Sequence, residues 1–135
     1  MKKLFINTNV LIDLIDKRIP FYNDVEVISA LAEKKQLTLA ASSISFVNSF
    51  YVLSKKLVTN SLMRYKLICE VSNIDTIIID KSLISNFNDF EDALQHYSAL
   101  HHKCDILITR NKKNSKNFEI PVMMPTEFLA PLQKS

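Results

Sequence analysis

Two hydrophobic patterns alternate along the chain. Short apolar runs of strand length occur at residues 4–6, 37–41, 75–80 and 105–109, and residues 122–123 offer an edge strand. Between these runs, apolar residues recur at three- and four-residue steps. This spacing predicts helices from about residue 10 to a break at 17–20, over 22–35, 44–57, 62–72 and 81–86, from the cluster at 88–92 to about 102, and from 125 onward. The run at 75–80 is the clearest predicted strand, because it is β-branched and continuously apolar.

This order of elements predicts an α/β fold. Strands that are separated by helical crossovers pair in parallel and carry helices on both faces. We therefore predict a three-layer α/β/α sandwich around a central, mostly parallel sheet of four to five strands. No internal repeat, low-complexity segment or linker divides residues 1–135, so a single domain is expected.

Composition narrows the classes of function. The chain has no glycine, and it therefore lacks the glycine-rich phosphate loop of Walker-type NTPases and of dinucleotide-binding domains. Its net charge of +3 is too small to indicate a partner class. No apolar run approaches the ~20 residues that span a bilayer, no secretory signal precedes the first strand, and Cys69 and Cys104 have no metal-ligand or redox spacing. We expect a cytoplasmic protein with no membrane partner, in which both thiols are reduced and packed.

The first predicted strand runs directly into a helix through Asn7, Thr8 and Asn9. In an open parallel sheet, ligands bind in the crevice beyond the carboxyl ends of the strands. This turn is therefore expected to line the site. Other polar residues that stand near strand ends or helix starts are expected to join it: Asn48, Asp89, Glu91, Asp92, Asp105, Thr109, Arg110, Asn111 and Asn114.

Each of these residues, taken alone, has an ordinary structural explanation. Asp89 or Asp92 is explained as the N-cap or first-turn anion of its helix. Asp105 is a common turn residue before a strand, and the lysines of residues 112–116 are typical of a solvated loop. The three histidines, at 96, 101 and 102, lie near a helix C-terminus, where a partly charged imidazole suits the helix dipole. The hypothesis of a site depends on the whole constellation.

Three segments resemble the motifs of one family in order and spacing. Residues 5–13, 89–95 and 105–113 resemble the PIN domain, the metal-dependent ribonuclease family that includes the VapC-type toxins, and residues 120–129 resemble its C-terminal strand and helix. The resemblance implies hydrolysis of single-stranded RNA by water activated between clustered carboxylates and Mg²⁺ or Mn²⁺. It also implies a small antitoxin protein as partner and a homodimer. The family's acidic positions correspond to Asn7, Asn48, Asp92, Asp105 and Asn114.

The resemblance assigns expected roles to these positions. Asp92 and Asp105 are the expected principal metal ligands, Asn7 and Asn114 are weaker oxygen ligands, and Asp89 and Glu91 are reserves. Asp92, Asp105 and Asn7 are the expected catalytic residues. The expected substrate-binding residues are Thr8, Asn48, Thr109, Arg110 and Asn111. An amide keeps one oxygen ligand but removes a negative charge and adds donors that repel a cation, so weak activity is expected.

Alternatives stay open at this point. A catalytically degenerate PIN domain could bind RNA or a protein partner, because the loss of carboxylates lowers repulsion of phosphates and Lys112, Lys113 and Lys116 stand at the rim. A phospho-acceptor receiver domain needs acidic residues after the first strand, where this chain has Asn7. Within the predicted helix 44–57, the aromatic residues at 46, 50 and 51 are expected in the core rather than at an interface, although periodicity does not separate the two.

Overall fold

The structure is a computed structural model that describes residues 1–53, 58–112 and 115–133. Its strands are β1 (Lys3–Ile6), β2 (Thr38–Ser42), β3 (Cys69–Ser72), β4 (Ile106–Ile108) and β5 (Val122–Met123). Its α-helices are α1 (Thr8–Asp16), α2 (Tyr22–Glu33), α3 (Ser43–Leu53), α4 (Val58–Ile68), α5 (Thr76–Leu83), α6 (Phe90–His101) and α7 (Pro125–Gln133). A short 3-10 helix spans Ser115–Asn117.

The described strands form one sheet of five parallel strands in the order β3-β2-β1-β4-β5. The central strand is β1, in which Leu4 pairs with Leu39 of β2 on one side and with Ile106 of β4 on the other. Successive side chains of a strand point to opposite faces. Leu4 and Ile6 accordingly pack with residues of α1, α2, α4 and α7, whereas Phe5 packs with Ala99 of α6 on the other face.

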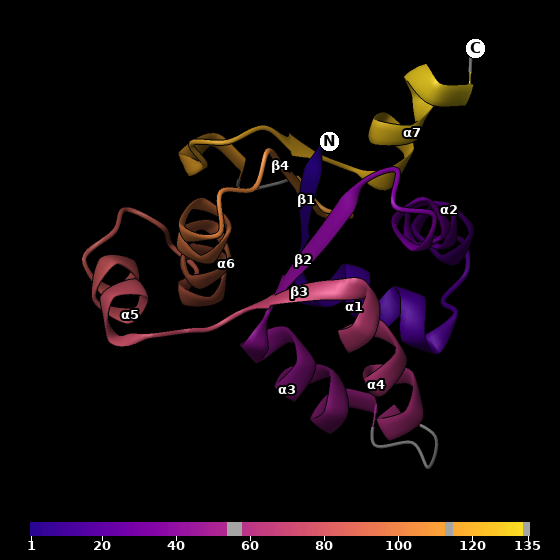
Figure 1. Cartoon of the computed structure of the whole chain (residues 1–135). Helices are drawn as coiled ribbons and strands as arrows, with labels where there is room; N and C mark the ends of the chain where they lie inside the picture. Colours follow the sequence, from indigo (N-terminus) through magenta and orange to yellow (C-terminus); the bar gives the residue numbers. More distant parts are fainter. Residues whose placement is uncertain (54–57, 113–114, 134–135) are drawn as a thin grey trace.

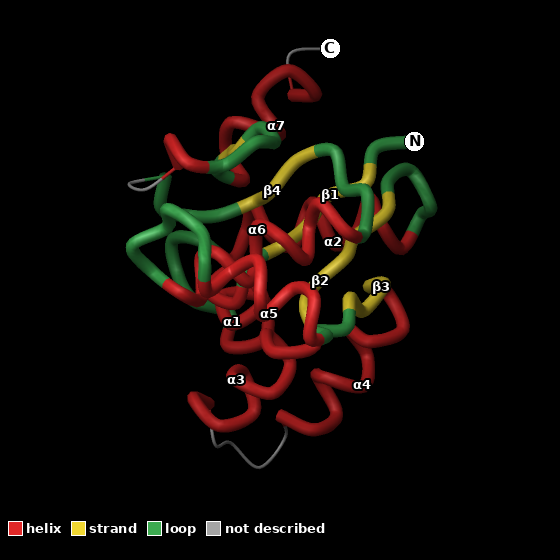
Figure 2. The backbone as a smooth tube through the Cα atoms, turned by 90° about the vertical axis from the view of Figure 1, so that its left-hand side faces the viewer, coloured by secondary structure: helices red, strands yellow, loops and turns green. Residues whose placement is uncertain are grey.

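The helices enclose the sheet on both faces (Figure 1), which confirms the predicted α/β/α class. On the second face, α5 packs against α6 on the side away from the sheet (Figure 1), and Figure 2 views the molecule from that side. None of the helices in the described ranges is long and apolar enough to cross a membrane.

The strongest strand prediction is wrong. Residues 76–83 form helix α5, which Asp75 caps by accepting a hydrogen bond from the backbone N–H of Ile78 at 2.9 Å. Ile78 is buried, but Ile77 is 61% and Ile79 38% exposed. The continuous apolar run at residues 75–80 is therefore not a strand buried between two layers of helices. One face of a helix is buried, and the β-branched composition that favours a strand is overridden by packing and by the cap.

The place of the missing strand is taken by β3, which lies inside the predicted helix 62–72. The other differences are boundary shifts. Helix α2 ends at Glu33 and not at 35, the predicted helix 81–86 is replaced by the last turn of α5 and the non-helical residues after it, and the strand predicted at 105–109 is limited to Ile106–Ile108. The predicted C-terminal part of helix 44–57 lies outside the described residues from 54 onward.

Candidate functional site

A polar cleft of about 320 Å³ opens at the carboxyl end of β1, between the starts of α1 and α6 and one face of α3. This is the position at which an open parallel sheet binds ligands. Six residues that the sequence predicted for the site line it together: Asn7, Thr8, Asn9, Asn48, Glu91 and Asp92. Gln95 of α6 completes its polar wall beside Glu91, and Arg18, Tyr51 and Val52 lie at other parts of the lining.

Both polar atoms of the Asn7 side chain form hydrogen bonds that fix the turn between β1 and α1 at the cleft. Its Oδ1 accepts a hydrogen bond from the backbone N–H of Val10 at 3.1 Å and so caps α1. Its Nδ2 donates to Oγ1 of Thr109 at 2.7 Å, just past the end of β4. Asparagine is among the best N-cap residues, so the strand-to-helix turn that the sequence predicted is stabilised by the same side chain that was expected as a ligand.

The Glu91 side chain is held across the cleft. Its Oε1 accepts hydrogen bonds from the hydroxyl of Thr8 at 3.0 Å and from Nδ2 of Asn48 at 3.2 Å. These donors belong to α1 and α3, whereas Glu91 lies in the first turn of α6. The sequence placed Glu91 in the acidic cluster as a reserve only, because side-chain direction within that cluster follows from tertiary contacts.

Thr8 also lies at the centre of a partly buried network of hydroxyl and amide groups. Its Oγ1 is 2.8 Å from Oγ of Ser45, and Nε2 of Gln95 donates to Ser45 at 3.2 Å and to Thr8 at 3.4 Å. Because the single hydroxyl proton of Thr8 goes to Glu91, the Ser45 hydroxyl donates to Thr8. Sequence reasoning missed Ser45 and Gln95, although Gln95 follows Glu91 by four residues and so shares its face of α6.

Asp92 is half-buried on the wall of the cleft. Its backbone N–H donates to Oδ1 of Asp89 at 3.0 Å, which makes Asp89 the N-cap of α6. The ordinary explanation of Asp89 as a helix cap is therefore confirmed. Carboxylates in the first turn of a helix are favoured by the helix dipole, and here Glu91 and Asp92 both border the cleft.

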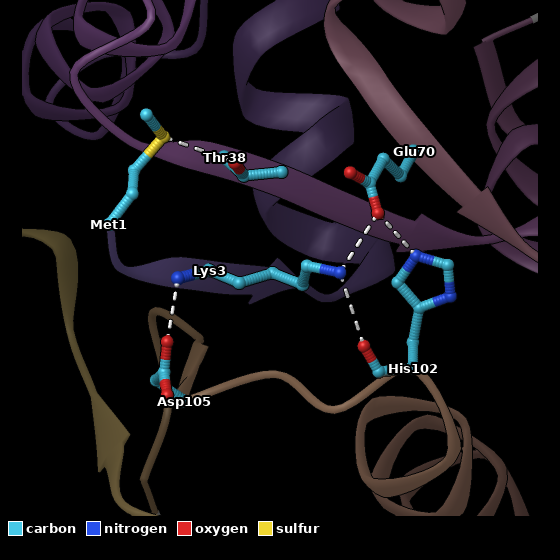
Figure 3. A network of polar contacts seen from close by, with 6 residues as sticks. All are labelled: Met1, Lys3, Thr38, Glu70, His102 and Asp105. Carbon is cyan, nitrogen blue, oxygen red and sulfur yellow. Dashed lines mark hydrogen bonds and ion pairs between the residues drawn. The ribbon is translucent and has the colours of Figure 1, made fainter.

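Asp105 lies at the opposite edge of the sheet, the amino edge, where the parallel strands begin. Its Oδ2 accepts from the backbone N–H of Lys3 at 2.8 Å (Figure 3). Its own N–H donates to the Lys3 carbonyl at 2.8 Å. Lys3 begins β1, so Asp105 stands at the amino end of the strand whose carboxyl end carries Asn7. At ~3.3 Å per residue, three steps of β4 put it about 10 Å from the cleft edge. The prediction that Asp105 and Asp92 share one metal ion is corrected.

Around Asp105 the structure forms a separate charged network. Oε1 of Glu70 lies 3.0 Å from Nζ of Lys3 and 2.7 Å from Nε2 of His102 (Figure 3). The hydrogen bonds from Lys3 and His102 lower the pKa of the Glu70 carboxyl below its ordinary value. These contacts tie β1, β3 and the end of α6 together at the amino edge of the sheet.

The residues after β4 are occupied by structural contacts. Thr109 is buried, and besides accepting from Asn7 its Oγ1 exchanges hydrogen bonds of 3.2 Å with the backbone of Asn111. The guanidinium of Arg110 lies 4.7 Å from the ring centroid of Phe21, and its Nη1 is 3.4 Å from Oδ1 of Asp13. Arg110 thus contacts the protein rather than the cleft, which corrects its predicted role in binding substrate. Asn114 lies outside the described residues.

The partner of Arg110, Asp13, is a fully buried carboxylate. Burial raises its pKa above the ordinary value, while the charges of Arg110 and Arg18 oppose the rise. Neither carboxylate oxygen of Asp13 has a hydrogen-bond partner among the described residues. An unpaired buried charge is strongly destabilising. The Arg110 side chain therefore stays beside Asp13, because it provides the opposite charge that the buried carboxylate requires.

The donor set of the cleft fits a hard divalent cation with few protein ligands. Within the described ranges, no group of three or more His, Cys, Asp or Glu side chains is arranged to hold a metal. Two carboxylates, Glu91 and Asp92, nevertheless line the cleft together with amide and hydroxyl groups. Mg²⁺ is commonly held by one or two carboxylates plus waters and substrate phosphates rather than by an all-protein cage. The cleft therefore fits such an ion, with less charge than a fully acidic site.

Comparison with known proteins points in one direction. A sequence model of the PIN domain matches residues 3–113. The chain is 31% identical over 139 aligned positions to a protein named Ribonuclease VapC1 from Aquifex aeolicus (strain VF5), an alignment that covers 94% of this chain and 93% of the relative.

Solved structures share the fold. One is VapBC2 from Rickettsia felis bound to a DNA fragment from its promoter, with a TM-score of 0.68 and 20% identity over 90% of this chain and 98% of that one. Another is a toxin-antitoxin complex from Klebsiella pneumoniae, with a TM-score of 0.63 and 25% identity over 90% and 97% of the two chains.

Proposed function

The chain belongs to the PIN domain family, and we propose that it is a cytoplasmic, toxin-like endoribonuclease that cleaves single-stranded RNA with Mg²⁺ or Mn²⁺. The observation that carries the proposal is Asp92, a carboxylate that lines the same cleft as Asn7 at the carboxyl edge of the sheet. The similarity to a relative named Ribonuclease VapC1 supports the class of reaction.

Each residue of the cleft has a role in this proposal. Asp92 would hold the cation, and the Oδ1 of Asn7 would be a weak additional ligand, since a carbonyl oxygen that caps a helix keeps a second lone pair. A bound ion would neutralise the scissile phosphate and lower the pKa of the attacking water. Thr8 and Asn48 would position neighbouring groups through their hydrogen bonds, and Thr109 would hold the Asn7 side chain in its rotamer.

The test is cleavage of a fluorescently end-labelled single-stranded RNA by the purified chain. We expect slow cleavage with MnCl₂, none after addition of EDTA, and none for Asp92→Asn. Asp105→Asn is the matched control, because it makes the same substitution at the opposite edge of the sheet and should cleave like the wild type. Intact RNA at every MnCl₂ concentration, together with cleavage by the Asn7→Asp, Asn114→Asp double variant, would exclude activity of the natural chain.

A second candidate function is a catalytically degenerate PIN domain that binds RNA or a protein without cleaving it. The observation that favours it is the full engagement of Asn7, whose two polar atoms both serve the fold. The basic rim is weaker than expected, because Lys112 pairs with Glu127 at 3.0 Å. Binding of labelled RNA that falls steeply with salt and leaves the RNA intact would favour this candidate. Salt-insensitive binding, or none, would exclude the RNA-binding form.

The proposal includes a small antitoxin partner and a homodimer. The neighbours described as VapBC2 and as a toxin-antitoxin complex support the first. The outer face of α3 offers apolar surface beside the cleft, where Val47, Phe50, Tyr51 and Val52 are 48–73% exposed. Phe46 packs on the core as expected, but the prediction of a core position is wrong for Phe50 and Tyr51.

Substitutions on this outer face of α3 test the oligomeric state. Light scattering after size-exclusion chromatography should give twice the chain mass for the wild type and a monomer for Phe50→Ser, Tyr51→Ser. Co-expression with the product of a short adjoining reading frame should yield a stable complex in which RNA cleavage is suppressed. A monomeric wild type would exclude the homodimer, and unsuppressed cleavage in such a complex would exclude that product as an antitoxin.

A further inference from the structure

We propose that Glu91 is a second carboxylate ligand of the cation in this cleft, held ready by Thr8 and Asn48. The inference deepens the proposed function and rests on it, since it concerns the same site. It adds a ligand that local sequence position alone would not select, because an acidic residue in the first turn of α6 is already explained by the helix dipole.

The direction of the Glu91 side chain goes beyond what the dipole requires. A first-turn carboxylate gains the dipole interaction wherever its side chain turns. Glu91 is exposed, yet its side chain reaches across to the Thr8 hydroxyl on α1 at 3.0 Å and to the Asn48 amide on α3 at 3.2 Å. Residues of three helices thus fix one carboxylate in the lining of the cleft.

Both hydrogen bonds end on the same oxygen of Glu91. Oε1 accepts from Thr8 and Asn48, whereas Oε2 has no hydrogen bond or ion pair to any residue that the structure describes. An ionised carboxylate offers about four lone-pair sites on its two oxygens. Metal-ligating carboxylates are typically oriented by hydrogen bonds from outer groups in this way. Thr8 and Asn48 therefore act as positioning residues, and Oε2 is left for a ligand.

Gln95 gives an independent indication that the cleft receives a ligand. It is only 3% exposed, it lines the cleft, and its Oε1 has no hydrogen-bond partner within the described ranges. A buried acceptor without a donor is destabilising. The water shell of a hydrated divalent ion carries such donors, because Mg²⁺ keeps several of its waters when it binds. Gln95 lies one turn after Glu91, so the unsatisfied acceptor and the positioned carboxylate lie on the same face of α6.

The charge of the site also fits two carboxylates. Asn7 and Asn48 are neutral. Among the residues that the structure describes, Arg18 is the cation that lines the cleft, and it is paired with Asp16 at 3.1 Å. Asp92 alone would give the site one negative charge. With Glu91 the site has two, which balances a divalent ion and lies within the one or two carboxylates that are usual for Mg²⁺.

The experiment is calorimetric titration of the full chain with MnCl₂, with no RNA present. Glu91→Gln keeps the length and the acceptor oxygen for Thr8 and Asn48 while removing the charge. We expect the Kd for Mn²⁺ to rise about tenfold or more, since even outer-shell changes cost 10–100-fold. Thr8→Val should weaken Mn²⁺ binding and Thr8→Ser should restore it. Asp105→Asn, which removes a carboxylate at the far edge, should bind like the wild type.

The outcomes separate this inference from the proposed function. Wild-type binding that is lost in Asp92→Asn but unchanged in Glu91→Gln overturns the role of Glu91 and leaves the metal-dependent function standing. A wild type that binds no Mn²⁺ overturns both. An increase in RNA affinity for Glu91→Gln without a change in Mn²⁺ binding also overturns the inference, because Glu91 would then only occlude the cleft. Circular dichroism melts of each variant identify any loss that comes from unfolding.

Discussion

Asn7 donates a hydrogen bond from Nδ2 to Oγ1 of Thr109 at 2.7 Å, and this contact joins the end of β1 to the residue that follows β4. The same side chain caps α1 through Oδ1. An aspartate here would keep the cap but lose the amide donor. The residue at position 7 therefore sets both the geometry of the sheet edge and the charge of the cleft.

The first prediction concerns Asn7→Asp. Asp and Asn are equally good N-caps. The Thr109 hydroxyl can donate to the new carboxylate in place of the Asn111 carbonyl to which it now donates, so the free energy of unfolding should fall by no more than about 1 kcal/mol. The added charge in the cleft should tighten Mn²⁺ binding by about tenfold. Titration with MnCl₂ and urea denaturation measure the two effects. Asn60→Asp on α4 adds the same charge away from the cleft, and equal tightening there would contradict the prediction.

Asp13 provides a prediction about pH. Its pKa is raised by burial in the folded chain, so the folded state binds this proton more tightly than the unfolded state does. The free energy of unfolding should therefore decrease as pH rises from about 3.8 through the raised pKa. Asp13→Asn lacks this dependence, and its stability relative to the wild type should increase over that window. Urea denaturation at a series of pH values measures the difference.

Arg110 supplies the control for Asp13, because its charge is the largest influence that opposes the rise. Arg110→Met should leave the buried carboxylate without its partner and extend the pH-dependent loss of stability to higher pH. Parallel stability curves for the wild type and Asp13→Asn would show that Asp13 has the same pKa in both states.

Glu70 is expected to act in the opposite sense. Hydrogen bonds from Lys3 and His102 lower its pKa, so its contribution is present above the unfolded value of 4.5 and is lost as pH falls through the lowered folded value. Glu70→Gln should be less stable than the wild type at neutral pH by about 0.2–1 kcal/mol, the range for exposed pairs. Thermal melts should show that the difference disappears in acid. A difference that persists there would have to come from packing.

The sequence predicted best where structure is local. The turn from β1 into α1 was predicted because an apolar run, a capping Asn7 and a helical repeat follow one another directly, and the structure confirms it. A strand was predicted at residues 75–80, and the helix α5 that lies there could not be inferred from a local pattern. Ile77, Ile78 and Ile79 have strand propensity, and only the packing of α5 on α6 decides that Ile78 alone is buried.

The residues of the candidate site show the same difference between local and tertiary information. Asp92 and Asn48 were placed correctly at the cleft because both stand near the starts of helices that follow strands or loops at one edge of the sheet. Asp105 precedes its strand, so it belongs to the opposite edge, and the topology already implied this. The position of Glu91 depends on donors from two other helices, which no local pattern encodes.

The last prediction concerns the two cysteines. Cys69 and Cys104 are free, buried thiols, as the sequence suggested, and burial raises the pKa of each to about 12. Because the thiolate is the reactive form, each should react with Ellman's reagent at pH 8 about a thousandfold more slowly than in the chain unfolded by guanidinium. Lys34→Cys provides an exposed thiol as an internal reference. If Cys69 or Cys104 reacted as fast as that reference in the folded chain, local opening of the β3 or β4 end of the sheet would have to be frequent, and the amino-edge network of Lys3, Glu70 and His102 would not hold it closed.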